Sequence, residues 1–451
     1  MPEAPAAPGD APSTPRLAAL QRGLRWLARL GVIVHAAFLP ISIAGMQIGL
    51  GVSLGALVAL RVSGRRAWAH SPLDLPCLLL VGCAIVSLGL GALGGSPPVG
   101  WHEATLWRSI LSPLVVLSAI EVEGGRAAGD RGASRRLALQ VLGVWAAASL
   151  LPSALAWVQY WTGFDPLYAM HLRAAPVHGT VPIYPGRFAA VGFFHWYQRL
   201  AHNLLPPLCV AAAVAVYGRV AGRLRALLIG ASIAAAAAIV LTLSRAAWAT
   251  LVLAAIVIVV LLSRSRGWAI AAVVVASTAM AINPGVRVRI EALRVPGDND
   301  DRKFIWEVCR EVIGDHPLTG VGWGNLPRRS IPYYDRVTPW GGMRAWCHDS
   351  FLSAWAEGGP LLFVALAAFW ALLLRAFWRV RRSSDPLARA AGAGALAALA
   401  AMLANSLVHD ILYASEDVYA LGFALAVAMA LARSGGDQLA ARPAREIASD
   451  R

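Results

Sequence analysis

The sequence predicts an all-α membrane protein that crosses the bilayer about 12 times and carries a long, partly helical loop on one side. Three observations support this fold class. Apolar stretches of roughly 20 residues, the length that a membrane-spanning helix needs, recur along the chain. Charged residues make up only 14% of the chain, against about 25% in soluble domains. Arginine-rich connectors separate many of the apolar stretches, as in cytoplasmic loops.

The predicted spans begin and end where apolar residues give way to Gly, Pro or charged residues. They are expected at residues 28–45, 46–62, 73–92, 104–121, 137–159, 197–217, 225–242, 246–262, 268–284, 351–375, 388–409 and 418–433. Spans 1–9 thus occupy residues 28–284, and spans 10–12 occupy residues 351–433. The long loop between them covers residues 285–350. Residues 1–27, rich in Pro and Ala and without the pattern of a signal peptide, are predicted to be a disordered cytoplasmic segment, and residues 434–451 a cytoplasmic tail.

The distribution of arginine orients the chain. One set of connectors, together with the segment Arg16–Arg29, is rich in arginine, which marks the cytoplasmic side of a membrane protein. The arginines of these connectors are Arg61, Arg65, Arg66, Arg126, Arg131, Arg135, Arg136, Arg219, Arg223, Arg225, Arg264, Arg266, Arg379, Arg381, Arg382 and Arg389. The opposite connectors near residues 93–103 and 410–417 carry neither Lys nor Arg. Both termini are therefore predicted to be cytoplasmic, and the long loop periplasmic.

Three connectors on the predicted outer side nevertheless carry basic residues. Arg173 and Arg187 lie in one connector, and Arg245 lies in a tight turn. The long loop holds Arg287, Arg289, Arg294, Arg302, Lys303, Arg310, Arg328, Arg329, Arg336 and Arg344. Contact with lipid headgroups explains a single arginine, whereas three basic loops on one face favour an anionic ligand. The net charge of +15 therefore does not predict nucleic-acid binding.

The long loop has structure of its own. Apolar residues recur at helical spacing from about Arg302 to Gly314, which predicts an amphipathic helix. Residues 319–325 form a glycine-rich turn that is similar to a phosphate-binding loop, but no strand precedes it and no Lys-Ser/Thr pair follows. None of the five cysteines has metal-binding spacing. Cys309 and Cys347 share this loop, and the sequence leaves their pairing open while favouring two free thiols.

Four short motifs place chemically active residues on the predicted outer face. They are Gly186-Arg187-Phe188 with His195 and Gln198, Leu243-Ser244-Arg245-Ala246-Ala247-Trp248, Arg302-Lys303-Phe304 followed by His316-Pro317-Leu318-Thr319-Gly320, and His348-Asp349-Ser350 with Glu357-Gly358-Gly359. In this order, on one side of the membrane, the set resembles the O-antigen ligase and polymerase superfamily, and the O-antigen ligases most closely. The resemblance covers roughly residues 140–415. One departure is Asp349, because the family often has Asn after the histidine.

The resemblance implies a GT-C-like fold in the bacterial inner membrane with an active site that faces the periplasm. It implies an inverting, metal-independent glycosyltransferase without a cofactor. Such an enzyme moves finished O-antigen polysaccharide from undecaprenyl pyrophosphate to the lipid A–core oligosaccharide of lipopolysaccharide. Arg187, Arg245 and Arg302 match basic positions of the family and are expected to hold the pyrophosphate. His348 matches the histidine at the end of the loop and is expected to be the general base.

These residue types suit that chemistry. A pyrophosphate leaving group carries several charges, and each charge-assisted hydrogen bond to it contributes about 1.5–3 kcal/mol. His348 has an ordinary pKa of about 6.5, so an appreciable fraction is neutral near pH 7. Nearby arginines would lower this pKa and favour the neutral imidazole, which can accept a proton from an acceptor hydroxyl. An interfacial polar residue is the alternative reading of His348.

Other residues are candidates for supporting roles. Lys303, His195 and Gln198 could contact the phosphate or the sugar of the donor. The acidic run Asp298–Asp301 could hold a divalent metal, but a solvated turn with a helix cap explains it more simply. Glu357 could orient His348 or pack within the next helix. Flat faces for sugar rings, or parts of an interfacial aromatic belt, are offered by Tyr333, Tyr334, Trp340 and Trp346.

Two kinds of alternative function stay open. An O-antigen polymerase or a protein O-oligosaccharyltransferase would use the same arginines and histidine with a different acceptor. A lipid-linked sugar transporter or flippase is the alternative from another class. Ion-coupled carriers need ionisable groups within the bilayer, and the predicted spans carry almost no Asp or Glu near their middles. This composition favours chemistry at the membrane surface over transport.

Overall fold

The structure is a computed structural model. It describes residues 14–65, 67–96, 106–122, 131–172, 182–184, 187–263, 283–291, 300–337 and 345–434, with isolated residues between 267 and 282. The sections below concern these residues.

Helices make up most of the described chain. The long helices are α1 (Pro15–Phe38), α2 (Ile43–Val62), α3 (Asp74–Leu93), α6 (Arg131–Thr162), α8 (Tyr197–Tyr217), α9 (Gly222–Leu241), α10 (Arg245–Leu262), α16 (Ser350–Val380), α17 (Pro386–Ser406) and α18 (Ser415–Ser434). The shorter helices are η1 (Leu106–Leu111), α5 (Ser112–Glu121), α7 (Pro166–Ala169), α12 (Pro284–Glu291), α13 (Asp300–Asp315), α14 (Leu326–Arg329), α15 (Ile331–Val337) and η4 (Ile411–Tyr413). Two short strands, β1 (Pro182–Tyr184) and β2 (Arg187–Phe188), pair in antiparallel fashion. The predicted helical fold is thus observed, with a small ribbon that the sequence did not predict.

Nine helices of the described residues are long and apolar enough to cross a membrane, which is typical of a multi-pass membrane protein. They are α2, α3, α6, α8, α9, α10, α16, α17 and α18. Each corresponds to one of the predicted spans. The span predicted at residues 104–121 is divided between η1 and the short helix α5. The span predicted at 268–284 lies largely outside the described residues.

The N-terminal helix corrects two expectations. It begins at Pro15, so residues 15–27 are helical rather than disordered. The Thr14 side chain caps the helix by accepting a hydrogen bond from the backbone N–H of Leu17 at 3.4 Å. The helix ends at Phe38, and a turn that contains Pro40 separates it from α2. A span over residues 28–45 is therefore wrong in its boundaries, because proline stops the helix inside that range.

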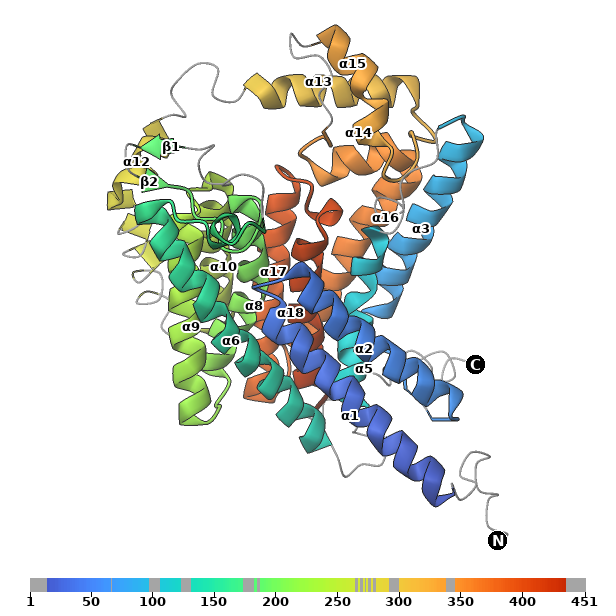
Figure 1. Ribbon diagram of the computed structural model, residues 1–451, viewed down its shortest axis with the longest axis vertical. Coiled ribbons are helices and arrows are strands. Elements are labelled where there is room, and N and C mark those ends of the chain that lie inside the picture. Colours follow the sequence, from blue (N-terminus) through green and yellow to red (C-terminus); the bar gives the residue numbers. More distant parts are fainter. Residues whose placement is uncertain are drawn as a thin grey trace, which may run out of the picture.

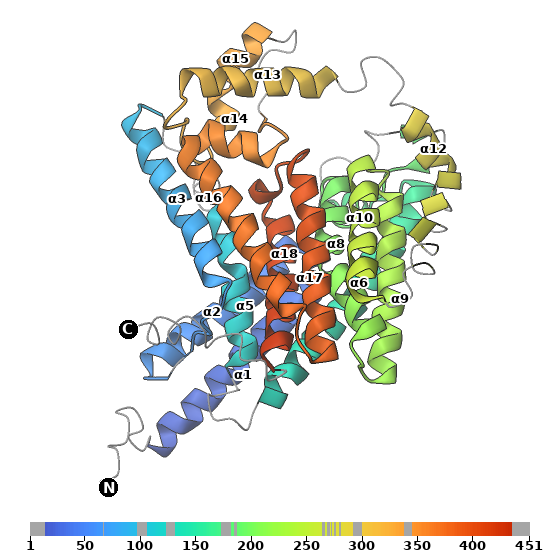
Figure 2. The same cartoon turned by 180° about the vertical axis from the view of Figure 1, so that it is seen from behind.

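The bundle is arranged around α8, α17 and α18. Between 78% and 89% of the residues in the apolar stretches of these three helices are buried, against 22% for α10, so α10 lies at the periphery. Helices α9 and α10 flank the centre on one side, and α3 packs against α16 on the other (Figure 1). Helices α13, α14 and α15 form a cap over one end of the bundle in both views (Figures 1 and 2). The start of α1 and the end of α18 lie at the opposite end.

The cap has its own small core and a disulfide. Ile305, Val308 and Val312 on one face of α13 pack with Tyr334 of α15. Cys309 of α13 is bonded to Cys347, which precedes α16. The sequence favoured two free thiols, and this expectation is wrong, because the fold brings together two positions that are 38 residues apart. The bond joins the helix that begins near Arg302 to the segment that carries His348.

Candidate functional site

His348 lies at the point where the cap meets the bundle. It is followed by Asp349, which caps α16 by accepting hydrogen bonds from the backbone N–H groups of Phe351 and Leu352 at 2.8 and 3.0 Å. Asp349 is therefore the N-cap of α16. The backbone of His348 has a φ of +50°, a left-handed conformation that few residues other than glycine adopt. Its side chain is 45% exposed, so the imidazole is accessible at this end of the bundle.

A buried carboxylate holds the backbone of His348. The N–H of His348 donates a hydrogen bond to Oδ2 of Asp410 at 2.6 Å, and the imidazole Nδ1 lies 3.7 Å from the same oxygen. The hydroxyl of Ser353 donates to the other oxygen of Asp410. Burial raises the pKa of Asp410 to about 6. This carboxylate is therefore mostly ionised at pH 7 and can stabilise an imidazolium beside it.

The imidazole of His348 is biased toward its neutral form. Burial is the main cause that lowers the pKa of His348 below its ordinary value, and the charges of Arg302 and Arg199 lower it further. A histidine with a lowered pKa is unprotonated over more of the neutral pH range. This state is the one that a general base requires.

Arg245 and Arg302 share one region although they belong to different parts of the chain. Arg245 is the first residue of α10, which Ser244 caps, and Arg302 lies in the first turn of α13. Burial lowers the pKa of Arg302, and the positive charge of Arg245 lowers it further, whereas Tyr197 and Asp410 act in the opposite direction. Two guanidinium groups that repel each other at one site favour a bound anion between them.

Arg187 is placed only by its backbone. It lies in β2, opposite Tyr184, and its side chain is outside the described part of the structure. Shortly after this strand, the N–H of Ala190 donates to the carbonyl of Leu241 at 3.0 Å. This bond attaches the segment to the end of α9, directly before the turn that leads to Arg245. The backbone of Arg187 therefore lies near the α9–α10 turn.

The candidates for supporting roles, Lys303, His195 and Gln198, are at the same end of the bundle as His348. They have fewer contacts with the residues described above. Lys303 is exposed on α13. His195 is exposed just before α8, and Gln198 is partly buried in its first turn. Neither of these two side chains has a hydrogen bond to another described residue. Of the acidic run, Asp300 and Asp301 begin α13, and Asp298 and Asn299 lie outside the described residues.

Sequence reasoning missed a buried charged network beside His348. Arg199 of α8 donates to Oδ2 of Asp417 at 2.6 Å and lies 3.5 Å from Glu416. Nδ1 of His202 lies 3.1 Å from the same oxygen of Asp417. The ring of His202 lies 5.3 Å from that of His409, whose pKa is well below its ordinary value because of burial and the charge of His202. Arg199 is therefore held by carboxylates of this chain.

One signal in the sequence could have revealed this network. The connector near residues 410–417 lacks Lys and Arg. It also holds Asp410, Glu416 and Asp417 and follows His409. Three carboxylates on the predicted outer side, which also carries the unusual arginines, offer the complementary charges for one site.

The glycine-rich turn at residues 319–325 is a packing element. The N–H of Val321 donates to the carbonyl of Ala356 at 2.9 Å, and the N–H of Gly322 donates to that of Glu357 at 2.7 Å. Gly320 has a φ of +62°, and a Cβ atom there would collide with the backbone of Glu357. The turn thus lies directly on α16, as expected for a segment that lacks the context of a nucleotide-binding loop.

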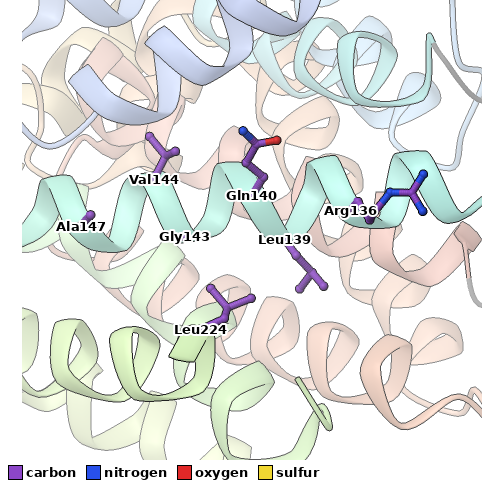
Figure 3. Close-up of a pocket in the computed structure, with 7 residues that line it drawn as sticks. All are labelled: Arg136, Leu139, Gln140, Gly143, Val144, Ala147 and Leu224. Carbon is purple, nitrogen blue, oxygen red and sulfur yellow. The ribbon is translucent and has the colours of Figure 1, made fainter. Parts of the chain in front are cut away.

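Two cavities lie away from His348. One, of about 470 Å³, lies between α6 and α9 and is lined mainly by apolar residues, with Arg136 at one end (Figure 3). It is near the start of both helices, at the end of the bundle opposite to the cap (Figure 1). The other, of about 370 Å³, lies in the cap between the end of α13 and α15, and its lining includes Asp315, His316 and Arg336. His348 lines neither cavity.

The arrangement combines an accessible base, a buried carboxylate and two guanidinium groups at one end of a membrane bundle. Residues 230–367 match the family model described as O-antigen ligase. The matched segment begins in α9, includes Arg245, Arg302 and His348, and ends in α16. A comparison with curated proteins found no match. This match covers about a third of the chain, and it supports membership of the O-antigen ligase superfamily.

Proposed function

We propose that the protein is an O-antigen ligase. It would transfer O-antigen polysaccharide from undecaprenyl pyrophosphate to lipid A–core oligosaccharide at the periplasmic face of the bacterial inner membrane. The observation that carries this proposal is the meeting of Arg245, Arg302 and His348 at one end of the bundle, within the segment that matches the family. Glycosyl transfer is the activity that the family implies.

The arginines would bind the pyrophosphate of the donor. Arg245 and Arg302 already lie close enough to repel each other, and an anion between them relieves this repulsion. As the bond to the sugar breaks, negative charge builds up on the leaving pyrophosphate. Guanidinium groups that are already in place stabilise this charge more strongly in the transition state than in the bound donor. Arg187 is proposed as a third contact on the basis of its backbone position.

His348 would accept the proton of the acceptor hydroxyl. The hydroxyl oxygen attacks the anomeric carbon while its proton passes to the neutral imidazole. The bond between this carbon and the pyrophosphate oxygen breaks, and its electron pair leaves with undecaprenyl pyrophosphate. Attack on the face opposite to the leaving group inverts the anomeric centre. Asp410, 3.7 Å from Nδ1, would stabilise the imidazolium that forms.

Two observations support a periplasmic site. The arginine-rich connectors lie toward the opposite end of the bundle, and such connectors are typical of the cytoplasmic side of a membrane protein. The disulfide between Cys309 and Cys347 belongs to the cap, and disulfides persist in the oxidising periplasm but are rare in the cytoplasm.

A reconstituted assay tests the proposal. Purified protein is mixed with lipid-linked O-antigen and rough lipopolysaccharide, and ligated product is measured by gel electrophoresis, with and without excess EDTA. We expect ligation in EDTA, and loss by about 10²–10⁴-fold in His348→Ala. The matched control is His316→Ala, which replaces the histidine that directly follows α13, at the end of this helix away from Arg302.

Four other outcomes would contradict the proposal or part of it. Polymerisation of the donor without use of lipopolysaccharide would indicate a polymerase, and transfer to protein would indicate an oligosaccharyltransferase. Movement of donor across vesicles without transfer would indicate a flippase. Strict dependence on a divalent metal would leave ligation in place but direct attention to Asp298–Asp301.

A further inference from the structure

We propose that Glu357 is a positioning residue for the proposed transfer reaction. It keeps the segment that carries His348 aligned with Asp410. This inference rests on the proposed function. Glu357 lies in α16, is fully buried, and is not expected to touch substrate. Its importance comes from the three separate segments that it connects.

A kink in α16 makes the surroundings of Glu357 unusual. Gly359 has φ +60° and ψ −157°, which interrupts the helix, and Pro360 follows it. The carbonyl groups one turn earlier are therefore available to other segments. The carbonyl of Glu357 accepts hydrogen bonds from the N–H of Gly322 at 2.7 Å and from the hydroxyl of Ser87 at 2.9 Å. The kink thus binds α16 to α3 and to the glycine-rich turn.

The side chain of Glu357 forms hydrogen bonds to further segments of the chain. Its Oε1 accepts hydrogen bonds from the backbone N–H of Leu326 at 3.2 Å and from the indole N–H of Trp346 at 3.3 Å. The hydroxyl of Tyr413 and the backbone N–H of Gly324 lie near this carboxyl group, although its Oε2 and the Tyr413 hydroxyl have no hydrogen bond among the described residues. One buried side chain therefore meets the turn before α14, the segment before α16 and the connector after α17.

Two of these contacts are close in sequence to the candidate base and to the carboxylate that holds its backbone. Trp346 precedes His348 by two residues, and Tyr413 follows Asp410 by three. The ring of Tyr413 stacks on Trp323 at 4.9 Å and lies 5.4 Å from Trp346. The carboxylate and this aromatic group thus join the chain that carries His348 to the chain that carries Asp410. The N–H of His348 bonds to Asp410 at 2.6 Å, a distance that depends on this alignment.

The chemistry of Glu357 favours positioning over packing. Burying a carboxylate is costly unless hydrogen-bond donors surround it, and an apolar residue fills the same volume without that cost. Here the donors come from segments that are distant in sequence, so the hydrogen bonds fix the positions of those segments. A residue that only filled space would need neither the carboxylate nor its donors.

The test compares Glu357→Ala, Glu357→Gln and the control Leu373→Ala in the reconstituted ligation assay. Leu373 is fully buried in α16 beyond the kink, so its truncation destabilises the helix away from His348. For each variant, donor-binding sites are counted with labelled undecaprenyl pyrophosphate, and kcat per binding site, KM and the pH profile are measured. We expect Glu357→Ala to lower kcat per site by about 100-fold, as for a misplaced catalytic group, with KM for the donor unchanged. The acidic limb of its pH profile is expected to move, because the environment of His348 changes.

Glu357→Gln keeps one acceptor oxygen and is expected to recover part of the lost kcat. Leu373→Ala is expected to lower the number of binding sites but to leave kcat per site and the pH profile unchanged. The inference is overturned if Glu357→Ala also loses only binding sites, with normal kcat per site and an unmoved acidic limb. If the unaltered protein does not ligate at all, the proposed function fails instead, so the two failures are distinguishable.

Discussion

His348 shows how a single residue acquires its chemistry from its neighbours. Its ring is partly exposed, yet burial and two arginines lower its pKa, and Asp410 lies on its other side. The residue type and its place at the end of the loop could be predicted from the sequence. Asp410 could not, because it is 62 residues further along the chain and is brought to His348 only by the fold.

The lowered pKa of His348 predicts the pH dependence of ligation. Only the neutral imidazole accepts a proton, so kcat/KM falls as the pH falls through the pKa of His348 in the folded enzyme. Because that pKa is lowered, half-maximal activity on the acidic side is expected below about pH 6.5, the ordinary value for histidine. Measurement of kcat/KM between pH 4.5 and 8 checks this, with buffers of constant ionic strength.

Asp410→Asn provides the matching control for this profile. Loss of the carboxylate charge destabilises the imidazolium, so the acidic limb is expected to move to still lower pH. Two results would contradict the assigned environment of His348. One is an acidic limb with its midpoint above pH 6.5 in the unaltered protein, and the other is a midpoint that moves to higher pH in Asp410→Asn.

At the scale of elements, the sequence predicted local features well and contacts between segments poorly. The helix α13 was visible because its periodicity depends on a few consecutive residues. The disulfide, the β1–β2 ribbon and the network around Asp417 depend on pairings between distant segments. The start of α1 at Pro15 could not be predicted, because a Pro- and Ala-rich composition is also typical of disordered segments.

The disulfide gives a prediction at this scale. Cys309→Ser with Cys347→Ser frees α13 from the segment before α16, and loss of such a bond costs about 2–4 kcal/mol of stability. We expect a lower Tm and a lower kcat, because Arg302 and His348 lie on the two segments that the bond joins. Thermal unfolding in detergent, before and after reduction, measures the first effect.

Cys83→Ser is the control for this prediction. Cys83 is a free cysteine in α3 and is only partly buried, so its replacement is expected to leave both Tm and its response to reductant unchanged. If reduction does not alter the Tm of the unaltered protein, the disulfide makes no contribution in solution.

At the scale of the whole molecule, apolar length and composition were sufficient to predict the nine described helices that are long enough to cross a membrane, whereas the orientation inferred from the arginines stays a prediction. The thickness and polarity of the membrane set the length and composition of such helices, so both can be read directly from the sequence. How the cap sits on the bundle cannot be read in this way, and neither can the closeness of Arg245 to Arg302.

The orientation can be tested with one residue. Lys303 is the only lysine in the chain and is exposed on α13. An amine-reactive reagent that enters the periplasm but does not cross the inner membrane is expected to label Lys303 in intact cells. Mass spectrometry locates the label, and Lys303→Arg is the control. Labelling that requires cell lysis would place the cap in the cytoplasm and contradict the proposed orientation.

The central claim is that two arginines hold the pyrophosphate while His348 performs the transfer. The most direct measurement is equilibrium binding of undecaprenyl pyrophosphate to the purified protein and to Arg245→Ala, Arg302→Ala and His348→Ala, beside their ligation rates. The account predicts that each arginine variant binds about 10–100-fold more weakly, the equivalent of one charge-assisted hydrogen bond. It predicts that His348→Ala binds normally but does not ligate. Normal binding by both arginine variants, or normal ligation by His348→Ala, would contradict it.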